Sequence, residues 1–174
     1  MKHFLKYFLV AYLTLFCTNL LAQDKIVILD LKYVLNESKA GKGAQDFLKK
    51  SYNDQLKKFQ DIENALKKEE EDLLTKKTVL SKEEYVKKSD TLRKKVIDYR
   101  SQRRAAIDKI TTQRAESRSI LLKSIDPILI AYIKENNISV VIKKDATLGR
   151  DPKNDITKII VDKLDKVLPS LDLK

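Results

Sequence analysis

The feature that most constrains the fold is the stretch from residue 41 to residue 125. It contains no proline and only two glycines, Gly41 and Gly43, both at its start. Proline and glycine interrupt helices most strongly, so their absence over about half of the chain favours long helices. A polar break between Thr75 and Ser81 divides the stretch in two. We therefore expect an antiparallel helical hairpin whose ends meet, so that the flanking segments can pair into one small domain.

Apolar residues recur at seven-residue intervals along both halves of this stretch, as in one seam of a coiled coil. The first half carries Tyr52, Phe59, Leu66, Leu73 and Leu80, and the second half carries Tyr85, Leu92, Tyr99 and Ala106. The interleaved positions are mixed. The apolar ones are Leu48, Ile62, Val96 and Ile110, and the polar ones are Gln55, Glu69, Lys76 and Arg103. About one and a half apolar seams predict a thin, bendable hairpin.

The ends of the two helices carry local signals. The first helix is expected over residues 44–74, and Gly41-Lys42-Gly43 before it is interpreted as a flexible joint because it lacks the spacing of a phosphate-binding loop. Ser81 and Glu84 form the pattern of a capping box at the start of the second helix. Val79 and Leu80 just before it form either a hydrophobic staple, which we prefer, or an exposed apolar end.

The flanking segments carry the candidate strands. β-branched residues fill residues 25–31 and 138–143, the pattern of buried strands, and a short third strand is expected over residues 146–148. A helical turn over residues 32–37 should follow the first strand. Asp126 and Pro127 indicate a helix boundary or kink, after which the helical pattern resumes until Asn136 and Asn137 stop it.

A last helix is expected over residues 156–167. Asp155 should cap it and Pro169 should end it. Its inward residues are expected to be Ile159, Ile160, Val161, Leu164 and Val167. Together the elements predict an α+β fold: a discontinuous head of residues 23–40 and 126–174, and a coiled-coil hairpin of residues 41–125.

The predicted head has too few strands to be stable alone, and their edges are exposed. We expect strands of other copies of the chain to close these edges, so that several hairpins project from one shared body. The strand residues assigned to this contact are Ile26, Ile28, Val140 and Ile142.

Residues 1–22 have the layout of a cleaved secretory signal, with Lys2 and Lys6, an apolar run over residues 7–16, and Ala22 before the expected cut. The run is shorter than the ~18–20 apolar residues of a membrane-spanning helix. Phe16 before Cys17 excludes a lipid anchor. The only cysteine, Cys17, and the only histidine, His3, would leave with the signal.

The exported chain would therefore have no disulfide, no thiolate zinc site and no nucleophile paired with histidine. We expect no enzyme activity, no metal and no cofactor. Export, and the lack of an aromatic-rich β-sheet platform, also argue against a nucleic-acid partner.

Positive charge is concentrated on the hairpin. Without residues 1–22 the chain holds 34 basic and 25 acidic residues, net +9, and residues 41–125 hold 22 and 14 of these, net +8. Residues 82–125 alone hold 13 and 6. The densest basic residues are Lys87, Lys88, Arg93, Lys94, Lys95, Arg100, Arg103 and Arg104. A solvated lysine-rich helix is the ordinary interpretation, but the nearly neutral head favours a basic binding surface on the hairpin.

The order of these motifs resembles the Skp/OmpH family of periplasmic chaperones over the whole exported chain. The matching features are the signal peptide, the strand at 25–31, Leu35-Asn36-Glu37-Ser38, the restart Leu80-Ser81-Lys82-Glu83-Glu84, the strand at 138–142, and Asp155-Ile156-Thr157.

The resemblance implies a homotrimer with a central β body and three helical tentacles around a cavity that holds unfolded outer-membrane proteins. The eight basic residues above would then bind these client chains without ATP. Lipopolysaccharide or an anionic membrane surface stays open as a further partner, with no residues assigned to it. The alternative function is an exported coiled-coil structural protein, or an envelope-surface protein that binds anionic lipid, without chaperone clients.

Overall fold

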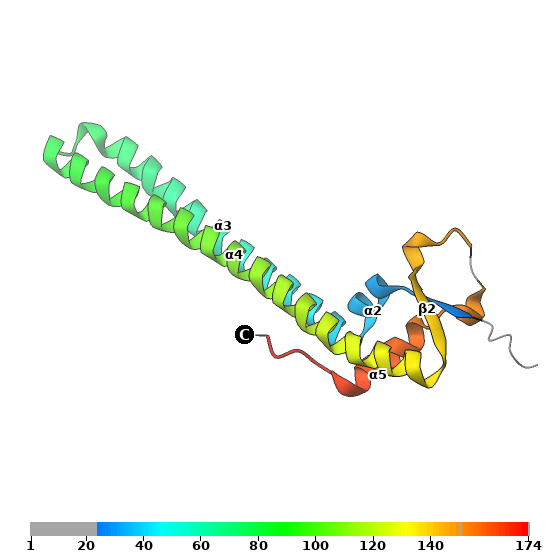
Figure 1. The fold of residues 1–174 in the computed structure, drawn as a ribbon. Helices are drawn as coiled ribbons and strands as arrows, with labels where there is room; N and C mark the ends of the chain where they lie inside the picture. The colour runs from blue at the N-terminus through cyan, green and yellow to red at the C-terminus, as the bar shows by residue number, and fades with distance from the viewer. Residues whose placement is uncertain (1–23, 150, 174) are drawn as a thin grey trace, which may run out of the picture.

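The computed structural model describes residues 24–149 and 151–173, and it consists of a long helical hairpin that projects from a small head (Figure 1). The predicted α+β fold is therefore confirmed. The expected secretory signal and the cut after Ala22 lie outside the described residues and stay predictions.

The hairpin consists of α3 (Lys39–Thr75) and α4 (Lys82–Glu135), joined at the tip by a 3-10 helix (Lys76–Thr78). The capping box is confirmed: the Ser81 hydroxyl accepts a hydrogen bond from the Glu84 backbone N–H at 3.3 Å, and Glu84 Oε2 accepts one from the Ser81 N–H at 3.2 Å. Val79 is 78% exposed, because none of the described elements lies beyond the tip to cover it. The preferred staple is therefore wrong for Val79, which is an exposed apolar end.

The joint before the hairpin is a tight turn, which corrects the expectation of a flexible one. The helix α2 (Leu31–Glu37) ends at Ser38, and α3 begins directly after it. The Ser38 side chain is fully buried, and its hydroxyl accepts a hydrogen bond from the Gly41 N–H at 3.2 Å. A Cβ atom at position 41 would collide with the Leu35 carbonyl oxygen, so glycine is needed there for close packing.

Helix α4 continues through Pro127, so the expected helix boundary at Asp126 and Pro127 is wrong. Proline removes one backbone donor, which normally weakens a helix. Here Ile125 on one side of it is buried, and Leu129 and Tyr132 on the other side pack against the same head core. Tertiary packing therefore holds the helix together until Asn136. The predicted end of the helix at Asn136 and Asn137 is confirmed, and Asn137 has a positive φ angle of 50°.

The head contains a two-stranded parallel sheet of β1 (Lys25–Leu29) and β2 (Ile138–Lys143), with Ile26 opposite Val140 and Ile28 opposite Ile142. Parallel strands need a long connection, and the hairpin supplies it. The expected third strand over residues 146–148 is wrong, because a 3-10 helix (Lys144–Ala146) occupies that part of the chain. The other edge of β1 is instead met by Asp155 in an isolated bridge to Ile28, with the Ile156 N–H donating to the Ile28 carbonyl at 3.0 Å.

The core of the head lies between the sheet and the helices. The strand residues Val27 and Leu29 face it, and the last helix, α5 (Thr157–Val167), closes it with Ile160 and Leu164, both fully buried. Asp155 was expected to cap this helix, but the N-cap residue is Ile156. Asp155 lies one residue before it, where its Oδ1 accepts a hydrogen bond from the Thr157 N–H at 3.0 Å.

Two of the five residues expected to face inward on α5 do not. Ile159 is 40% exposed and Val167 is 68% exposed. The buried stripe of α5 follows Ile160 and Leu164, four residues apart on one face, and the flanking positions turn away from the head.

Candidate functional site

The seam between α3 and α4 is thin, as predicted. Beyond the head core, the buried apolar side chains are few: Ala44, Leu48 and Phe59 on α3, and Leu92 and Ile110 on α4. Gln113 and Ser117 are buried beside them although both are polar. Most of the surface of both helices is therefore free for other contacts.

Polar contacts replace apolar ones in the middle of the seam. Lys95 Nζ lies 2.7 and 2.8 Å from the two carboxylate oxygens of Glu69, and the Tyr99 hydroxyl donates to Glu63 at 3.1 Å. The Tyr99 ring also meets Phe59 edge-on, with ring centroids 6.0 Å apart. Hydrogen bonds from Lys67 and then from Tyr99 hold the pKa of Glu63 below its ordinary value. These contacts fix the register of the two helices where apolar pairs are missing.

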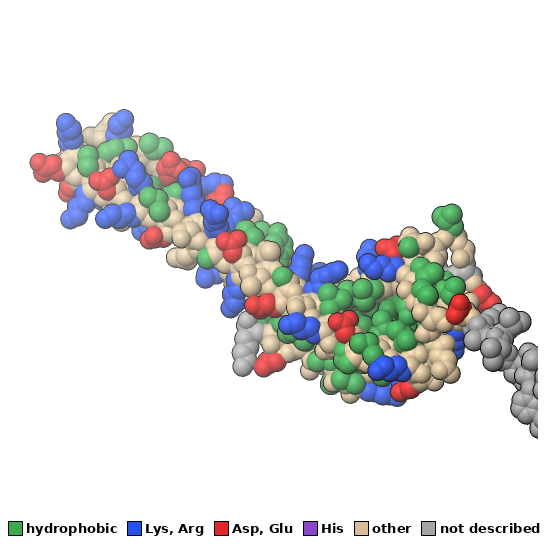
Figure 2. All heavy atoms as spheres, in the orientation of Figure 1, with side chains coloured by type: hydrophobic (Ala, Val, Ile, Leu, Met, Phe, Trp, Pro, Cys, Tyr) green, Lys and Arg blue, Asp and Glu red, His purple; other side chains and the backbone are tan. Residues whose placement is uncertain are grey.

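Two open grooves lie on opposite sides of the seam in the outer half of the hairpin. One, of about 500 Å³, is lined by acidic residues of α3 and by Lys87 and Lys88 of α4. The other, of about 690 Å³, is lined by Glu63 and Glu70 of α3 and by three arginines of α4: Arg93, Arg100 and Arg103. Figure 2 shows basic and apolar side chains mixed along this part of the molecule.

The eight basic residues predicted as a binding surface do not share one face. Lys87 and Lys88 line one groove, and Arg93, Arg100 and Arg103 line the other. Lys95 is engaged by Glu69, and Arg104 is strongly exposed, 4.0 Å from Asp108. The helix therefore separates lysines from arginines, a division that a count of charges does not reveal.

Sequence reasoning missed the exposed apolar residues of the hairpin. Six of them are between 48% and 59% exposed: Leu56, Leu74, Val86, Ile97, Ile107, and Tyr52, for which the predicted place in the seam is wrong. A signal was present, because Leu74, Val86, Ile97 and Ile107 each directly follow a seam residue and so cannot face the partner helix themselves. Charged and apolar groups therefore alternate on the hairpin surface.

In the head, the predicted contact residues are divided between exposed and covered positions. Ile26 and Val140 face each other in the register of the sheet and are 45% and 47% exposed. Ile142 is half-buried and Ile28 is buried. Among residues 24–149 and 151–173, the sheet has no strand beyond β2, so the outer edge of β2 is unpaired within the chain. An apolar pair next to an open edge is the arrangement expected for pairing with another copy.

In the described part of the chain, no group of three or more His, Cys, Asp or Glu side chains could hold a metal ion. Within those same residues, none of the helices is long and apolar enough to cross a membrane.

Comparisons with known proteins agree with this architecture. Residues 25–164 match the model of a family described as outer membrane protein (OmpH-like). The chain is 22% identical to a Skp-like protein of Pseudomonas aeruginosa over 170 residues, which cover 96% of this chain and 99% of the relative. The structure superimposes with a TM-score of 0.80 on a crystal structure of a candidate OmpH-like outer membrane chaperone from Caulobacter crescentus. That match has 19% sequence identity and covers 88% of this chain and 90% of the other.

Proposed function

The chain belongs to the OmpH-like family, and from this membership we propose that it is a periplasmic holdase, a chaperone that binds unfolded outer-membrane β-barrel proteins without ATP and prevents their aggregation. Family and fold support the coarser statement that it is an OmpH-like outer membrane chaperone. The holding mechanism and the clients are our proposal.

The observation that carries the proposal is the surface of the hairpin. It holds +8 of the net charge in residues 41–125, and half-exposed apolar side chains lie between its basic ones. An unfolded β-barrel protein presents apolar residues that aggregate easily, and weak contacts spread along a long surface can hold it reversibly. Basic side chains add long-range attraction for acidic chains, which salt weakens.

The test is refolding in the presence of the chain. A urea-denatured outer-membrane β-barrel is diluted with and without residues 23–174, at about 0.05 M and about 0.5 M salt, and light scattering is followed. We expect strong suppression of scattering at low salt and weaker suppression at high salt. Unchanged scattering at both salt concentrations would contradict the proposal.

We also propose that three copies assemble through the sheets of their heads, so that their hairpins enclose a space for the client. The exposed pair Ile26 and Val140 beside the open edge of β2 supports this assembly. Val140→Asp should dissociate the assembly in sedimentation experiments, whereas Val79→Asp at the exposed tip should leave it intact. A wild-type chain that sediments as a monomer at micromolar concentration would exclude the shared body.

A further inference from the structure

Arginine is confined almost entirely to one helix of the hairpin. The sequence contains seven arginines, and six of them lie in α4: Arg93, Arg100, Arg103, Arg104, Arg114 and Arg118. Helix α3 carries lysines and no arginine. Charge alone does not require this distribution, because lysine supplies the same charge.

The arginines of α4 lie on one side of the helix. Four of them directly follow residues that face the seam, with Arg93 after Leu92, Arg100 after Tyr99, Arg114 after Gln113, and Arg118 after Ser117. One residue turns an α-helix by about 100°, so each of these arginines leaves the seam in the same direction. Arg103 and Arg104 stand three and four residues after Arg100 and so lie next to it on the helix surface.

Three lysines of α4 lie on the other side of the seam. Each of them directly precedes a residue of the seam: Lys88 precedes Ser89, Lys95 precedes Val96, and Lys109 precedes Ile110. The same rotation of about 100° therefore carries them away from the arginines. Lys95 is already bound by Glu69, whereas the arginine contacts seen here are exposed pairs within one helix, which hold side chains weakly.

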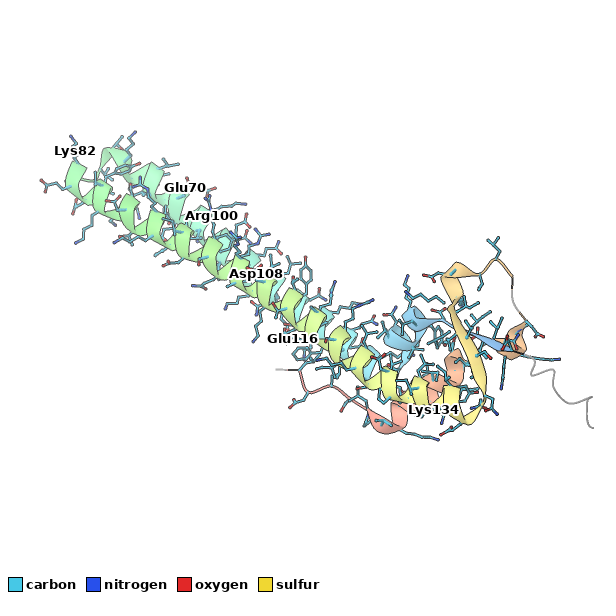
Figure 3. The ribbon with its side chains drawn as sticks, in the orientation of Figure 1. Glu70, Lys82, Arg100, Asp108, Glu116 and Lys134 are labelled. Atoms are coloured by element: carbon cyan, nitrogen blue, oxygen red, sulfur yellow. The ribbon has the colours of Figure 1, made fainter. Side chains whose placement is uncertain are left out.

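The arginines share their side with exposed apolar residues. Val86, Ile97 and Ile107 follow the seam residues Tyr85, Val96 and Ala106, and each is about half exposed. We define the arginine side by these residues together, as Val86, Arg93, Ile97, Arg100, Arg103, Arg104, Ile107, Arg114 and Arg118. Arg100 lies in the middle of the arginine side (Figure 3). Glu70 of α3 lines the same groove as Arg100.

The arginine side is hollowed along most of its length. The groove of about 690 Å³ contains Arg93, Arg100 and Arg103, and a second groove of about 680 Å³ at the base of the hairpin contains Arg114, Arg118 and Tyr52. A third, of about 590 Å³, contains Arg118 again with Lys32 and Lys143 of the head. Separate grooves therefore follow one another from the outer half of the hairpin to the head. In each of them the basic groups from α4 are arginines, and lysines come from α3 and from the head.

The side-chain chemistry identifies the occupant. A guanidinium group is planar and weakly hydrated, so it stacks on aromatic rings and grips carboxylates with two hydrogen bonds, which an ammonium group does not. The aliphatic side chains between the arginines supply apolar contact. A segment that fits this side carries aromatic and acidic residues, and strands of outer-membrane barrels are rich in aromatic residues at their ends.

We propose that the arginine side, rather than the lysine side, binds the client, and that it selects unfolded segments that carry aromatic and acidic residues. This inference rests on the proposed holdase function. A lipid surface fits less well, because a helix that lies on a membrane separates its apolar residues from its basic ones, whereas here the two kinds share one side.

The test compares variants that keep or remove charge. The triple variant Arg93→Lys, Arg100→Lys and Arg104→Lys keeps the charge and loses the guanidinium planes. The control variant, Lys87→Gln, Lys88→Gln and Lys109→Gln, loses charge away from the arginine side. Two labelled peptides serve as probes, one that alternates Tyr with Asp and Ser, and one with Leu in place of Tyr. Binding is followed by fluorescence anisotropy, and circular dichroism and sedimentation check folding and assembly.

We expect the arginine variant to bind the Tyr peptide about fivefold to tenfold more weakly than the wild type, with its affinity for the Leu peptide nearly unchanged. The lysine variant should weaken binding of both peptides equally, and more at low salt. Equal binding of the Tyr peptide by the arginine variant and the wild type would overturn the proposal. A loss of binding to phosphatidylglycerol vesicles without a loss of peptide binding would also overturn it, in favour of a lipid partner.

Failure of this inference differs from failure of the holdase function. If the arginine variant suppresses β-barrel aggregation and binds the Tyr peptide as well as the wild type does, the holdase function stands and the arginine side is wrong. If the wild type binds the Tyr peptide selectively but does not suppress aggregation, the arginine side stands as a peptide site and the holdase function is wrong.

Discussion

The head and the hairpin are held together in different ways. In the head, Val34, Ile160 and Leu164 have no exposed surface and belong to one continuous core built from the sheet and four helices. In the outer hairpin, single buried residues such as Phe59 and Leu92 are separated by polar contacts such as Lys95 with Glu69. The comparison teaches that stability is concentrated in the smaller region, so the longer one is free to vary its surface and to deform.

The largest effect should come from the head core. Ile160→Ala removes a fully buried side chain and should lower the free energy of unfolding by about 2–5 kcal/mol, measured by urea denaturation followed by circular dichroism. The control Ile159→Ala changes the neighbouring, 40% exposed residue and should cost less than about 1 kcal/mol. Similar losses for both variants would contradict the core described here.

A smaller and more local effect is expected at Phe59, the buried aromatic residue of the outer seam. Phe59→Ala removes its packing and its edge contact with Tyr99, and should destabilise the hairpin by about 3 kcal/mol, the lower end for a buried phenylalanine, because the thin seam can close around the gap. Hydrogen exchange should accelerate in the outer parts of α3 and α4 but not in the head. Faster exchange in both regions would mean that head and hairpin unfold as one unit, which would break the comparison.

The connection between the regions is tested by two nearby glycines. Gly41→Ala places a Cβ against the Leu35 carbonyl and should cost about 1–3 kcal/mol in the free energy of unfolding. Gly43→Ala meets nothing within 4 Å and should be neutral or stabilise the helix by up to about 1 kcal/mol. The midpoints of thermal unfolding of the two variants are compared, and equal midpoints would show that the turn at Ser38 is not tightly packed.

The smallest effect concerns the tip at acid pH. Hydrogen bonds from the Ser81 side chain and then from its backbone hold the pKa of Glu84 below its ordinary value, so the folded tip favours the ionised carboxylate. This stabilisation is complete above the unfolded pKa of about 4.3 and is lost as the pH falls through the lower folded pKa. NMR titration of the tip amides should show fraying in that window.

Ser81→Ala is the control for this titration. It removes the bonding partner, so the tip should be frayed at neutral pH already and should change little on acidification. The head has carboxylates of its own that accept backbone hydrogen bonds, such as Asp30 from the Tyr33 N–H, and Ser81→Ala does not change them, so the signals of the head should respond to acid equally in both proteins. Acid-induced fraying of the tip that is equally large in Ser81→Ala would contradict the assignment to Glu84.

Local signals in the sequence predicted most of the fold. Heptad spacing and the capping box at Ser81 predicted the hairpin, and β-branched runs predicted both strands, because these patterns depend on residues that are close in sequence. Two missed features depend on contacts distant in sequence: packing of the head carries α4 through Pro127, and Asp155 rather than a third strand meets Ile28. A third missed feature is local, since the turn from α2 into α3 brings Gly41 against the Leu35 carbonyl.

The candidate site was predicted in composition but not in arrangement. The eight basic residues were identified by counting charges, and such a count does not show on which side of the helix each residue lies. The direction was nevertheless present in the sequence, since Arg93 and Arg100 follow seam residues while Lys88 and Lys95 precede them. Burial of Leu92 and Ile110 confirmed the predicted seam, relative to which the two sides of the helix are defined.

Helix α4 is one continuous helix that is held in place at one end only. Its last turns are fixed by Leu121, Ile125 and Tyr132 in the head, and about 58 Å of helix extends from there to Lys82. When such a helix bends near the head, its displacement grows with distance from the head, so a bend of about 5° moves the tip by about 5 Å. The tip of the hairpin can thus be displaced by several ångströms while its base stays nearly fixed.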